Sequence, residues 1–348
     1  MARDKYRELA YKYAPIFAQK VSNEWPVADQ IAPVDFAGSI ARVAQNPRAL
    51  HSIKKKEEND YVIPAKVYYS ICETTTHYFL IYAIYHVLDW WKRYKPRDLY
   101  NTIRDMLDEH IHDMEGALLV VTKGQKGLKR GEEKSAEVRE ERVDGLVTVA
   151  HNNFYLYTEP RIPTGDGKWK EVNSQKLRVA KFNETVDGHI WLDRATERVK
   201  LYVESRGHGI RGDHKHWGGG DEIWYYYPKE KSVSPAHLDL KERETTRTVS
   251  YELEDIFAAK GLWAHRFNNR VFMQNKDGKW AFVYRGEDRK LHGGAANPPW
   301  SWNDHNDPSP MGEIATDPAR VIIRYAQGWG PVSTHYIYNP YQSIGLSA

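Results

Sequence analysis

The segment HYFLIYAIYHVLDWW, residues 77–91, contains the most apolar run of the chain, from Tyr78 to Leu88. Its aromatic and β-branched side chains favour extended structure. The run is much shorter than the roughly 20 apolar residues that a membrane-spanning helix needs. The sequence therefore predicts a strand here rather than a membrane span, and a β-rich fold around it.

Similar segments follow in both directions along the chain, rich in Val, Ile, Tyr, Trp and Thr and in many cases bounded by turn residues. They lie at residues 63–73, 75–91, 114–123, 145–158, 176–192, 198–206, 221–228, 245–254, 270–274 and 279–285. The sequence NKDG at 275–278 indicates a hairpin turn, because Asp-Gly readily adopts positive φ. Ten strand candidates with scattered helices predict a mainly β protein, an antiparallel two-sheet β-sandwich decorated with helices.

Helical periodicity is confined to two places. Near the N-terminus, one amphipathic stripe runs through Tyr6, Leu9, Ala10, Tyr13, Ala14 and Phe17. A second, short helix is expected at 97–109, and the charged insert at 123–144 is expected to be a surface loop. We expect one structural domain overall, with an N-terminal helix and lead-in at 1–60 and a β-sandwich at 61–348.

Composition excludes several classes of protein. The 348 residues are 41% hydrophobic and 28% charged, which rules out a wholly disordered chain. Fifty basic against 47 acidic residues leave a charge of +3, so a nucleic-acid partner has little support.

The single cysteine, Cys72, allows no intramolecular disulfide. Charges throughout residues 1–20 exclude a visible signal peptide. Cytoplasm is the default prediction, although a leader removed earlier would leave the same sequence.

Polar chemistry concentrates in EHIHDMEG at 109–116, which runs directly into an apolar strand. Side chains alternate along a strand, so Asp113 and Glu115 are expected on one face with Ala117 and Leu119. Two carboxylates at this spacing repel each other unless they are protonated or neutralised by a cation. A divalent ion resolves the conflict, and either His110 or His112 is a candidate imidazole ligand.

Other polar side chains also follow strands. Asp89 ends the segment 77–89, His151 follows 146–150, and His208 lies between two glycines after 199–206. Oxygen donors with one or two imidazoles favour Mg²⁺, Mn²⁺ or Ca²⁺, with Zn²⁺ or Fe²⁺ as alternatives. His110, His112 and Glu115 nearly match the cupin metal-binding pattern, in which His-x-His is followed by Glu. A facial triad beginning His-x-Asp fails, because Ile111 stands where histidine is needed.

EHIHDMEG resembles the GHRHDWE heptapeptide of the necrosis-inducing cytolysins (NLP proteins), and the related motif of a vacuolar-sorting-protein family of similar fold. Four more segments resemble blocks of these proteins in the same order. They are HYFLIYAIYHVLDWW at 77–91, TVAHNNFY at 148–155, VESRGHGI at 203–210 and GGAANPPWSWND at 293–304. The blocks span about two-thirds of the chain. Glu109, Ile111 and Met114 depart from the heptapeptide.

The resemblance implies a β-sandwich with a divalent cation held by Asp89, His110, Asp113 and Glu115, and with His208 nearby through water. It implies that His112 and His151 orient ligands or line the cavity, and these two are also the candidate catalytic residues. The implied partner is a small polar ligand, a glycan or a lipid headgroup bound in a Trp- and Tyr-lined cavity, with peripheral membrane contact as a further expectation.

Two alternatives stay open. A metalloenzyme, either a hydrolase or an oxygenase, would use the same ion with His112, His151 or His208 as general base. A purely structural cation site is the other. No G-x-S-x-G sequence marks a nucleophilic serine. The cluster at 213–217 is expected to be a loop, and the turn at 298–302 to pack against the sheet.

Overall fold

The computed structural model describes residues 2–22, 26, 28–34, 36, 63–87, 89, 112–124, 141–172, 178–179, 185–213, 222–229, 246–268, 271–272, 274–276, 279–281, 283–285, 291–293, 296–305, 310–327 and 331–346. The predicted helix at 97–109, the candidate ligand His110 and most of the charged insert lie outside these residues.

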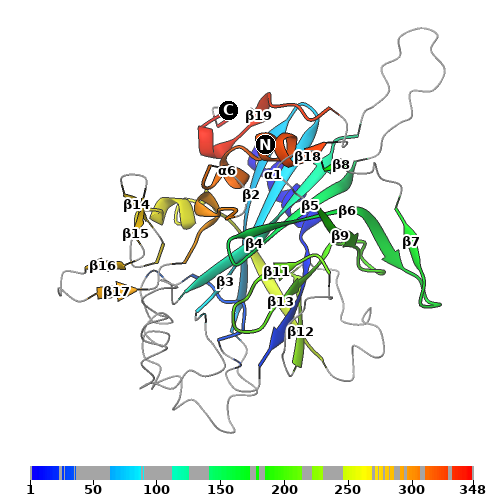
Figure 1. The fold of residues 1–348 in the computed structure, drawn as a ribbon, viewed down its shortest axis with the longest axis horizontal. Helices are drawn as coiled ribbons and strands as arrows, with labels where there is room; N and C mark the ends of the chain where they lie inside the picture. Colours follow the sequence, from blue (N-terminus) through cyan, green and yellow to red (C-terminus); the bar gives the residue numbers. More distant parts are fainter. Residues whose placement is uncertain are drawn as a thin grey trace.

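One large sheet dominates the described chain (Figure 1). Its strands are β1 (Ile16–Val21), β2 (Ala65–Thr74), β3 (His77–His86), β4 (Asp113–Thr122), β5 (Arg142–Ala150), β6 (Asn153–Pro163), β7 (Trp169–Glu171), β9 (Val186–Trp191), β10 (Lys200–Val203), β11 (Ile210–Arg211), β12 (Glu222–Pro228), β13 (Thr246–Asp255) and β19 (Tyr336–Tyr338). Their order is β11-β10-β1-β12-β13-β2-β3-β4-β5-β6-β7, with β19 added to β2 and β9 added to β6.

Six short strands pair two by two outside this sheet. They are β14 (Gln274–Lys276) with β15 (Lys279–Ala281), β16 (Val283–Arg285) with β17 (Leu291–Gly293), and β8 (Arg178–Val179) with β18 (Ala326–Gln327). Lys276 pairs with Lys279, so the hairpin predicted at NKDG is confirmed.

The prediction of a mainly β protein is confirmed, but the prediction of an antiparallel sheet is wrong, and a two-sheet sandwich is not confirmed. The sheet is mixed. From β2 to β6 consecutive strands pair antiparallel, whereas β1 with β10, β12 with β13, β13 with β2 and β6 with β9 pair parallel. The two-residue turns between β2 and β3 and between β5 and β6 allow only antiparallel pairing, whereas long connections permit either direction, and the connection 229–245 joins the parallel pair β12 and β13.

The predicted N-terminal helix is present as α1 (Ala2–Tyr13), but it is shorter than predicted. Phe17 belongs to strand β1 instead of the helical stripe. Pro15 explains the boundary, because proline lacks the backbone donor of a helix interior and disfavours helical geometry in the residue before it.

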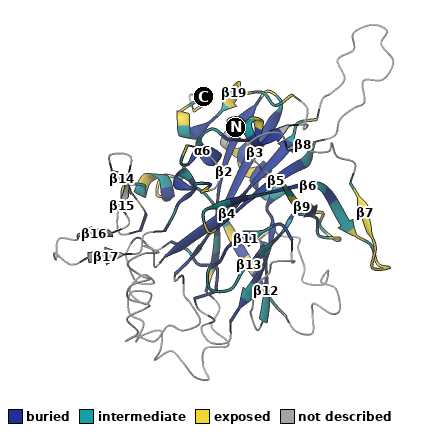
Figure 2. Cartoon of the chain, in the orientation of Figure 1, coloured by how far each residue is buried: buried dark blue, intermediate teal, exposed yellow. Residues whose placement is uncertain are grey.

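The sheet curls, so that β11 contacts β4 and β5 although it stands at the far end of the strand order. Strand alternation therefore creates two cores, and Figure 2 shows the central strands as almost entirely buried. The concave face holds Leu80, Leu119 and Leu201 and is covered at one end by α1, where the Tyr82 hydroxyl donates to the Ala10 carbonyl oxygen at 2.7 Å.

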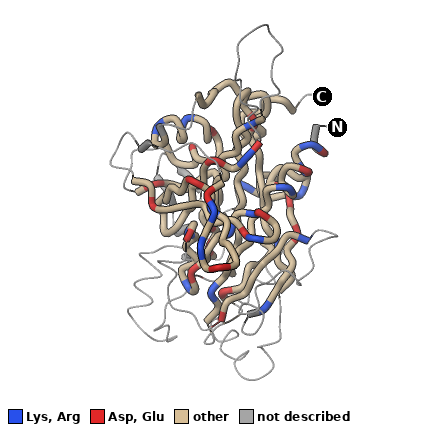
Figure 3. The backbone as a smooth tube through the Cα atoms, turned by 90° about the vertical axis from the view of Figure 1, so that its right-hand side faces the viewer, with Lys and Arg blue, Asp and Glu red and all other residues tan. Residues whose placement is uncertain are grey.

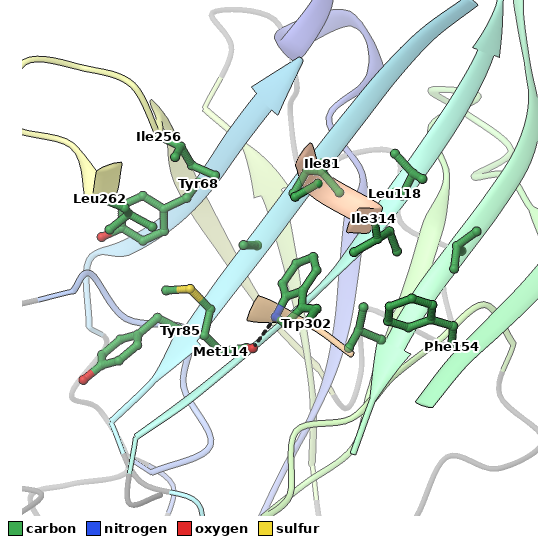
Figure 4. Close-up of a cluster of buried hydrophobic side chains, with 14 of the residues drawn as sticks. Tyr68, Ile81, Tyr85, Met114, Leu118, Phe154, Ile256, Leu262, Trp302 and Ile314 are labelled. Carbon is green, nitrogen blue, oxygen red and sulfur yellow. Dashed lines mark hydrogen bonds between the residues drawn. The ribbon is translucent and has the colours of Figure 1, made fainter. Parts of the chain in front are cut away.

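The convex face packs against the short helices η3 (Leu262–His265), η4 (Pro299–Ser301), α6 (Glu313–Thr316) and α7 (Pro318–Tyr325). Trp302 lies at the centre of this core, 1% exposed, with its Nε1 donating to the Met114 carbonyl oxygen at 3.0 Å (Figure 4). A Cβ on Gly116 would lie 2.3 Å from Trp302, so the sheet leaves room for the indole only because that residue is glycine. The predicted packing of the 298–302 turn against the sheet is confirmed.

Both termini lie at the same end of the molecule (Figures 1 and 3). The rings of Tyr6 and Tyr338 stack at 4.1 Å between centroids. Next to this pair, the carboxylate of the buried Glu73 accepts hydrogen bonds from Lys5 Nζ at 2.7 Å, from Lys123 Nζ at 2.6 Å and from the Tyr6 hydroxyl at 2.8 Å. The opposite end of the same strands carries the polar side chains that the sequence analysis identified.

Candidate carboxylate and histidine site

The site lies on the concave face, where β3 ends and β4 begins. His86 pairs with Asp113 across the two strands, and Ile84 pairs with Glu115. Strand alternation places both carboxylates on the face that also carries Ala117 and Leu119 in the apolar core. Asp113 is 3% exposed and Glu115 is 7% exposed. Two buried acids thus stand at the end of these strands that lies opposite α1.

His208 holds two carboxylates together. Its Nδ1 lies 3.1 Å from Asp113 Oδ2, and its Nε2 lies 3.2 Å from Asp29 Oδ1. Burial lowers the pKa of His208, but the hydrogen bonds and charges of Asp113 and Asp29 outweigh burial and raise the pKa to about 10. His208 is therefore a cation that neutralises part of the negative charge.

A second imidazole lies flat against His208. The ring of His86 stacks on it with centroids 3.8 Å apart and an interplanar angle of 4°. Gln19 fixes this ring, since its amide nitrogen donates to the carbonyl oxygens of Lys20 and Glu204 and its Oε1 faces His86 Nε2 at 3.0 Å. Burial and the neighbouring His208 hold the pKa of His86 well below its usual value, so His86 is neutral.

Glu115 is a buried acid whose two carboxylate oxygens differ in their contacts. Its Oε1 accepts from the His151 backbone N–H at 3.1 Å, whereas its buried Oε2 has no hydrogen-bond partner among the described residues. Burial raises the pKa of Glu115 well above its usual value, and the charges of Asp113 and Asp89 add to this effect. Asp89 therefore lies close enough to act on Glu115, as its position after β3 predicts.

His151 stands at the rim of the cluster, with 49% of its side chain exposed. Its Nε2 lies 3.1 Å from Glu204 Oε2, and the Arg211 Nε donates to Glu204 Oε1 at 3.2 Å. The hydrogen bond to Glu204 raises the pKa of His151 to about 9, against the opposing effect of burial. A charged imidazole is thus held in place where the site meets solvent.

His112 is separated from these groups. It precedes β4, is 2% exposed, and lies beside Tyr85 of the convex-face core, with its Nδ1 2.8 Å from the Tyr85 hydroxyl and 3.1 Å from the Val87 carbonyl oxygen. The structure therefore gathers Asp89, Asp113, Glu115, His151 and His208 and leaves His112 behind the strand.

The metal ligands themselves stay a prediction. In the part of the chain that the structure describes, no group of three His, Cys, Asp or Glu side chains is arranged so that it could hold a metal ion. The proposed fourth ligand His110 and the predicted loop residues 214–217 lie outside the described residues.

Five members of the cluster are not among the candidate ligands or catalytic residues of the sequence analysis: Gln19, Asp29, His86, Glu204 and Arg211. His86 had a signal, because it stands at the end of the same apolar strand that delivers Asp89. Asp29 had none, since it reaches the site from an irregular segment before β2.

Figure 3 shows basic and acidic residues interspersed along the described chain. None of its described helices combines the length and apolar character needed to cross a bilayer.

Comparison with known proteins gave few matches. No protein-family model matches the sequence, and no curated protein matches it. Solved structures of low similarity include the Necrosis and Ethylene inducing Protein 2 from the causal agent of cocoa's Witches Broom disease, at 18% identity and a TM-score of 0.22 over 45% of this chain and 48% of that one.

Another is NLPPya in complex with glucosamine, at 12% identity and a TM-score of 0.23 over 59% of this chain and 65% of the other. NLPPya in complex with mannosamine gives 12% identity and a TM-score of 0.22 over 59% of this chain and 64% of the other. The alignments thus cover about half to less than two-thirds of those proteins, and the resemblance to this family stays an expectation from the sequence motifs.

Proposed function

We propose that this end of the curled sheet binds a divalent cation and uses it to hold a polar headgroup or a glycan. Asp113, Glu115 and Asp89 would hold the ion, His110 would supply a fourth ligand, and His208 would orient Asp113 from its other side. Mg²⁺, Mn²⁺ and Ca²⁺ suit this oxygen-rich set best, with Zn²⁺ and Fe²⁺ as alternatives.

The observation that carries the proposal is the Oε2 atom of Glu115. It is buried without a hydrogen-bond partner among the residues described, and two further carboxylates act on the same side chain. Burying a carboxylate oxygen in this way is costly unless the charge is paired. A divalent cation would satisfy the oxygen and remove the repulsion between the three acids.

Neighbouring side chains would position the ligands of the ion and contact the bound molecule. His208 keeps Asp113 and Asp29 in fixed positions, and the stacked His86 and Gln19 hold His208 in turn. His151 stands at the exposed rim, where a ligand approaching the ion would meet it. A bound cation would supply a strong attraction for ligand oxygens.

Elemental analysis of the purified protein tests the proposal, followed by thermal unfolding with added Mn²⁺, Mg²⁺ or Ca²⁺. We expect a stoichiometric divalent ion and a rise of several degrees in Tm for the wild type. Because Asp113→Asn and Glu115→Gln each remove a ligand charge, we expect them to lose most of this rise.

Asp144→Asn is the matched control, since Asp144 is a buried carboxylate on β5 that pairs with Arg142 at 2.6 Å, away from the site. It should lower Tm but keep the response to cations. Equal responses in the wild type and in both site variants would remove Asp113 and Glu115 from the ligand set.

A metalloenzyme is the second candidate, and the pairing of His151 with Glu204 favours it. A carboxylate on one ring nitrogen, with the other nitrogen near solvent, is the usual arrangement of a general acid or base. Any activity that persists undiminished after verified removal of the metal by EDTA would defeat this version.

A further inference from the structure

Strand β6 contains a bulge near its C-terminal end. The register of β6 with β9 shifts between Thr158 and Arg161. Between them, Glu159 has φ of 52°, a left-handed conformation that is costly for a residue with a side chain. Bulges turn side chains to new directions and are common next to functional sites. Sheet pairing alone therefore does not explain the conformation of Glu159.

The side chains beside this bulge form a stack around one indole. The Arg161 guanidinium lies 3.4 Å from the centroid of the Trp169 ring on β7. The ring of His189 on β9 lies 6.4 Å from Trp169, nearly parallel to it at 21°. Glu159 Oε2 lies 3.5 Å from His189 Nδ1 and 4.0 Å from Arg161 Nη2. Three neighbouring strands thus hold the indole in one orientation.

The turn that joins β6 to β7 is also fixed. The Thr164 backbone N–H donates to the Lys168 carbonyl oxygen at 2.7 Å, and the Lys168 backbone N–H donates to Asp166 Oδ1 at 3.3 Å. A Cβ on Gly165 would lie 3.1 Å from Arg194 Nη1, so the turn packs against the segment between β9 and β10. The hairpin of β6 and β7 is therefore a firm support for Trp169.

Trp169 is an exposed apolar side chain on an otherwise polar hairpin. It is 46% exposed, and Figure 2 shows β7 exposed along its length. Arg161 covers one face of the indole, so the remaining area faces solvent. The other large apolar side chains exposed in the described chain belong to other elements: Phe267, Ile323, Ile337 and Leu346. The hairpin therefore lacks the contiguous apolar patch that a protein or lipid interface needs.

Charge and shape narrow the class of ligand. Residues 159–171 contain three acidic and three basic side chains, so the hairpin does not select an anion or a cation. Single-stranded nucleic acid stacks on aromatic rings too, but it is bound in a basic groove. A purely apolar ligand needs a pocket that encloses most of its surface. A sugar ring needs neither, because its C–H face stacks on the indole while its hydroxyl groups stay in water.

We propose that the exposed face of Trp169 binds the ring of a neutral sugar by stacking. This contact is separate from the carboxylate cluster, because the 11 residues of β6 begin beside His151 and extend for about 30 Å to the hairpin. It requires no bound cation, so the inference does not rest on the proposed cation site.

NMR spectroscopy of the full-length protein in EDTA tests the proposal with three probes, methyl β-D-glucopyranoside, methyl β-D-galactopyranoside and methyl α-D-mannopyranoside. We expect at least one of them to bind and to shift the Trp169 Nε1–H signal. Trp169→Ala removes the stacking surface and should weaken binding by about 10-fold or more, as for bases stacked on aromatic rings. Trp169→Phe keeps an aromatic face and should bind within roughly 3-fold of the wild type.

Phe267→Ala is the matched control. Phe267 is also an exposed aromatic side chain beside an arginine, with the Arg266 guanidinium 4.5 Å from its ring centroid. This variant should bind the sugars as the wild type does. Because Trp169 is half exposed on a short strand at the edge of the sheet, the Trp169 variants should keep a urea midpoint close to that of the wild type.

Equal sugar affinity in the wild type and Trp169→Ala overturns the inference, as does the failure of all three sugars to bind the wild type. Binding to phosphatidylcholine vesicles that Trp169→Ala abolishes, without sugar binding, would assign the indole to a lipid surface and also overturn it. A protein that binds no cation would defeat the proposed function but not this inference, since the sugars are measured in EDTA.

Discussion

Gly207 leaves room for the His151 ring because it has no side chain. The His151 ring occupies the space that any side chain at position 207 would take. His208, next in the chain, has φ of 51°, a left-handed conformation that non-glycine residues seldom adopt. The loop thus accepts backbone strain at His208 and gives up a side chain at Gly207, and both features serve the placement of two imidazoles.

We therefore expect Gly207→Ala to displace the His151 ring and break its hydrogen bond to Glu204. The overpacking should lower the free energy of unfolding by about 1–3 kcal/mol, which urea denaturation would measure. Gly165→Ala is the control, because its added Cβ would meet only the flexible end of Arg194, at 3.1 Å. An equal loss of stability in both variants would contradict this account of the loop.

The sequence predicts where the acids lie on the strands, but it does not predict which residues contact them. Alternation along β4 predicts that Asp113 and Glu115 share a face, and strand ends indicate Asp89, His151 and His208. The same alternation could have placed His112 on the opposite face, away from the carboxylates. Asp29 comes from an irregular segment, where no period relates sequence to position, whereas Glu204 directly follows β10, inside the predicted strand segment 198–206.

At the scale of elements, strand β3 begins with a buried histidine. His77 is 2% exposed, and its Nδ1 lies 2.8 Å from the Thr76 hydroxyl. Burial lowers the pKa of His77 to about 4. The native state therefore holds this imidazole neutral at a pH where the unfolded chain would protonate it.

The sign of the pH dependence follows. Above pH 6.5 the His77 imidazole is neutral in both the folded and the unfolded state, so it does not lower the free energy of unfolding. Between pH 6.5 and about 4 only the unfolded state binds the proton, and the free energy of unfolding therefore falls as the pH falls. We expect His77→Gln to remove a decline of up to about 3 kcal/mol over this range. Urea unfolding at successive pH values measures it. A wild-type profile in His77→Gln would refute the assignment.

Two elements show why periodicity succeeded or failed. The sequence predicts β3 and β4 because nearly all of their residues are buried and most of them are apolar or β-branched. β1 was missed because Ala14 and Phe17 continue the helical spacing of α1, and only Pro15 marks the change. The segment 145–158 is two strands divided by a turn at His151 and Asn152, and the asparagines there are typical of a turn.

At the scale of the whole molecule, the chain is closed at one end by contacts between its first helix and its last strand. Tyr6 of α1 stacks on Tyr338 of β19, and β19 pairs with the end of β2. No local pattern predicts this pairing, nor the insertion of β1 between β10 and β12, because such partners are chosen by the overall sheet.

We expect Tyr338→Ala to lower the free energy of unfolding by about 2 kcal/mol, since an aromatic pair contributes about 0.5–1.5 kcal/mol beyond burial. Hydrogen exchange should show the amides of α1 opening more readily. Ile337→Ala is the control, because Ile337 is adjacent but 45% exposed. Unchanged exchange in α1 after Tyr338→Ala would show that the ring pair does not anchor the helix.

The separation of the termini from the carboxylate cluster has a practical consequence. A ten-residue strand such as β3 extends about 30 Å, and the chain ends lie at one extremity of it while His86 and Asp113 lie at the other. An affinity tag, a fluorescent fusion or a biotin anchor attached at either terminus would leave the polar end facing outward. A sensor chip coated in this way would present every immobilised molecule with its cluster towards the flowing sample.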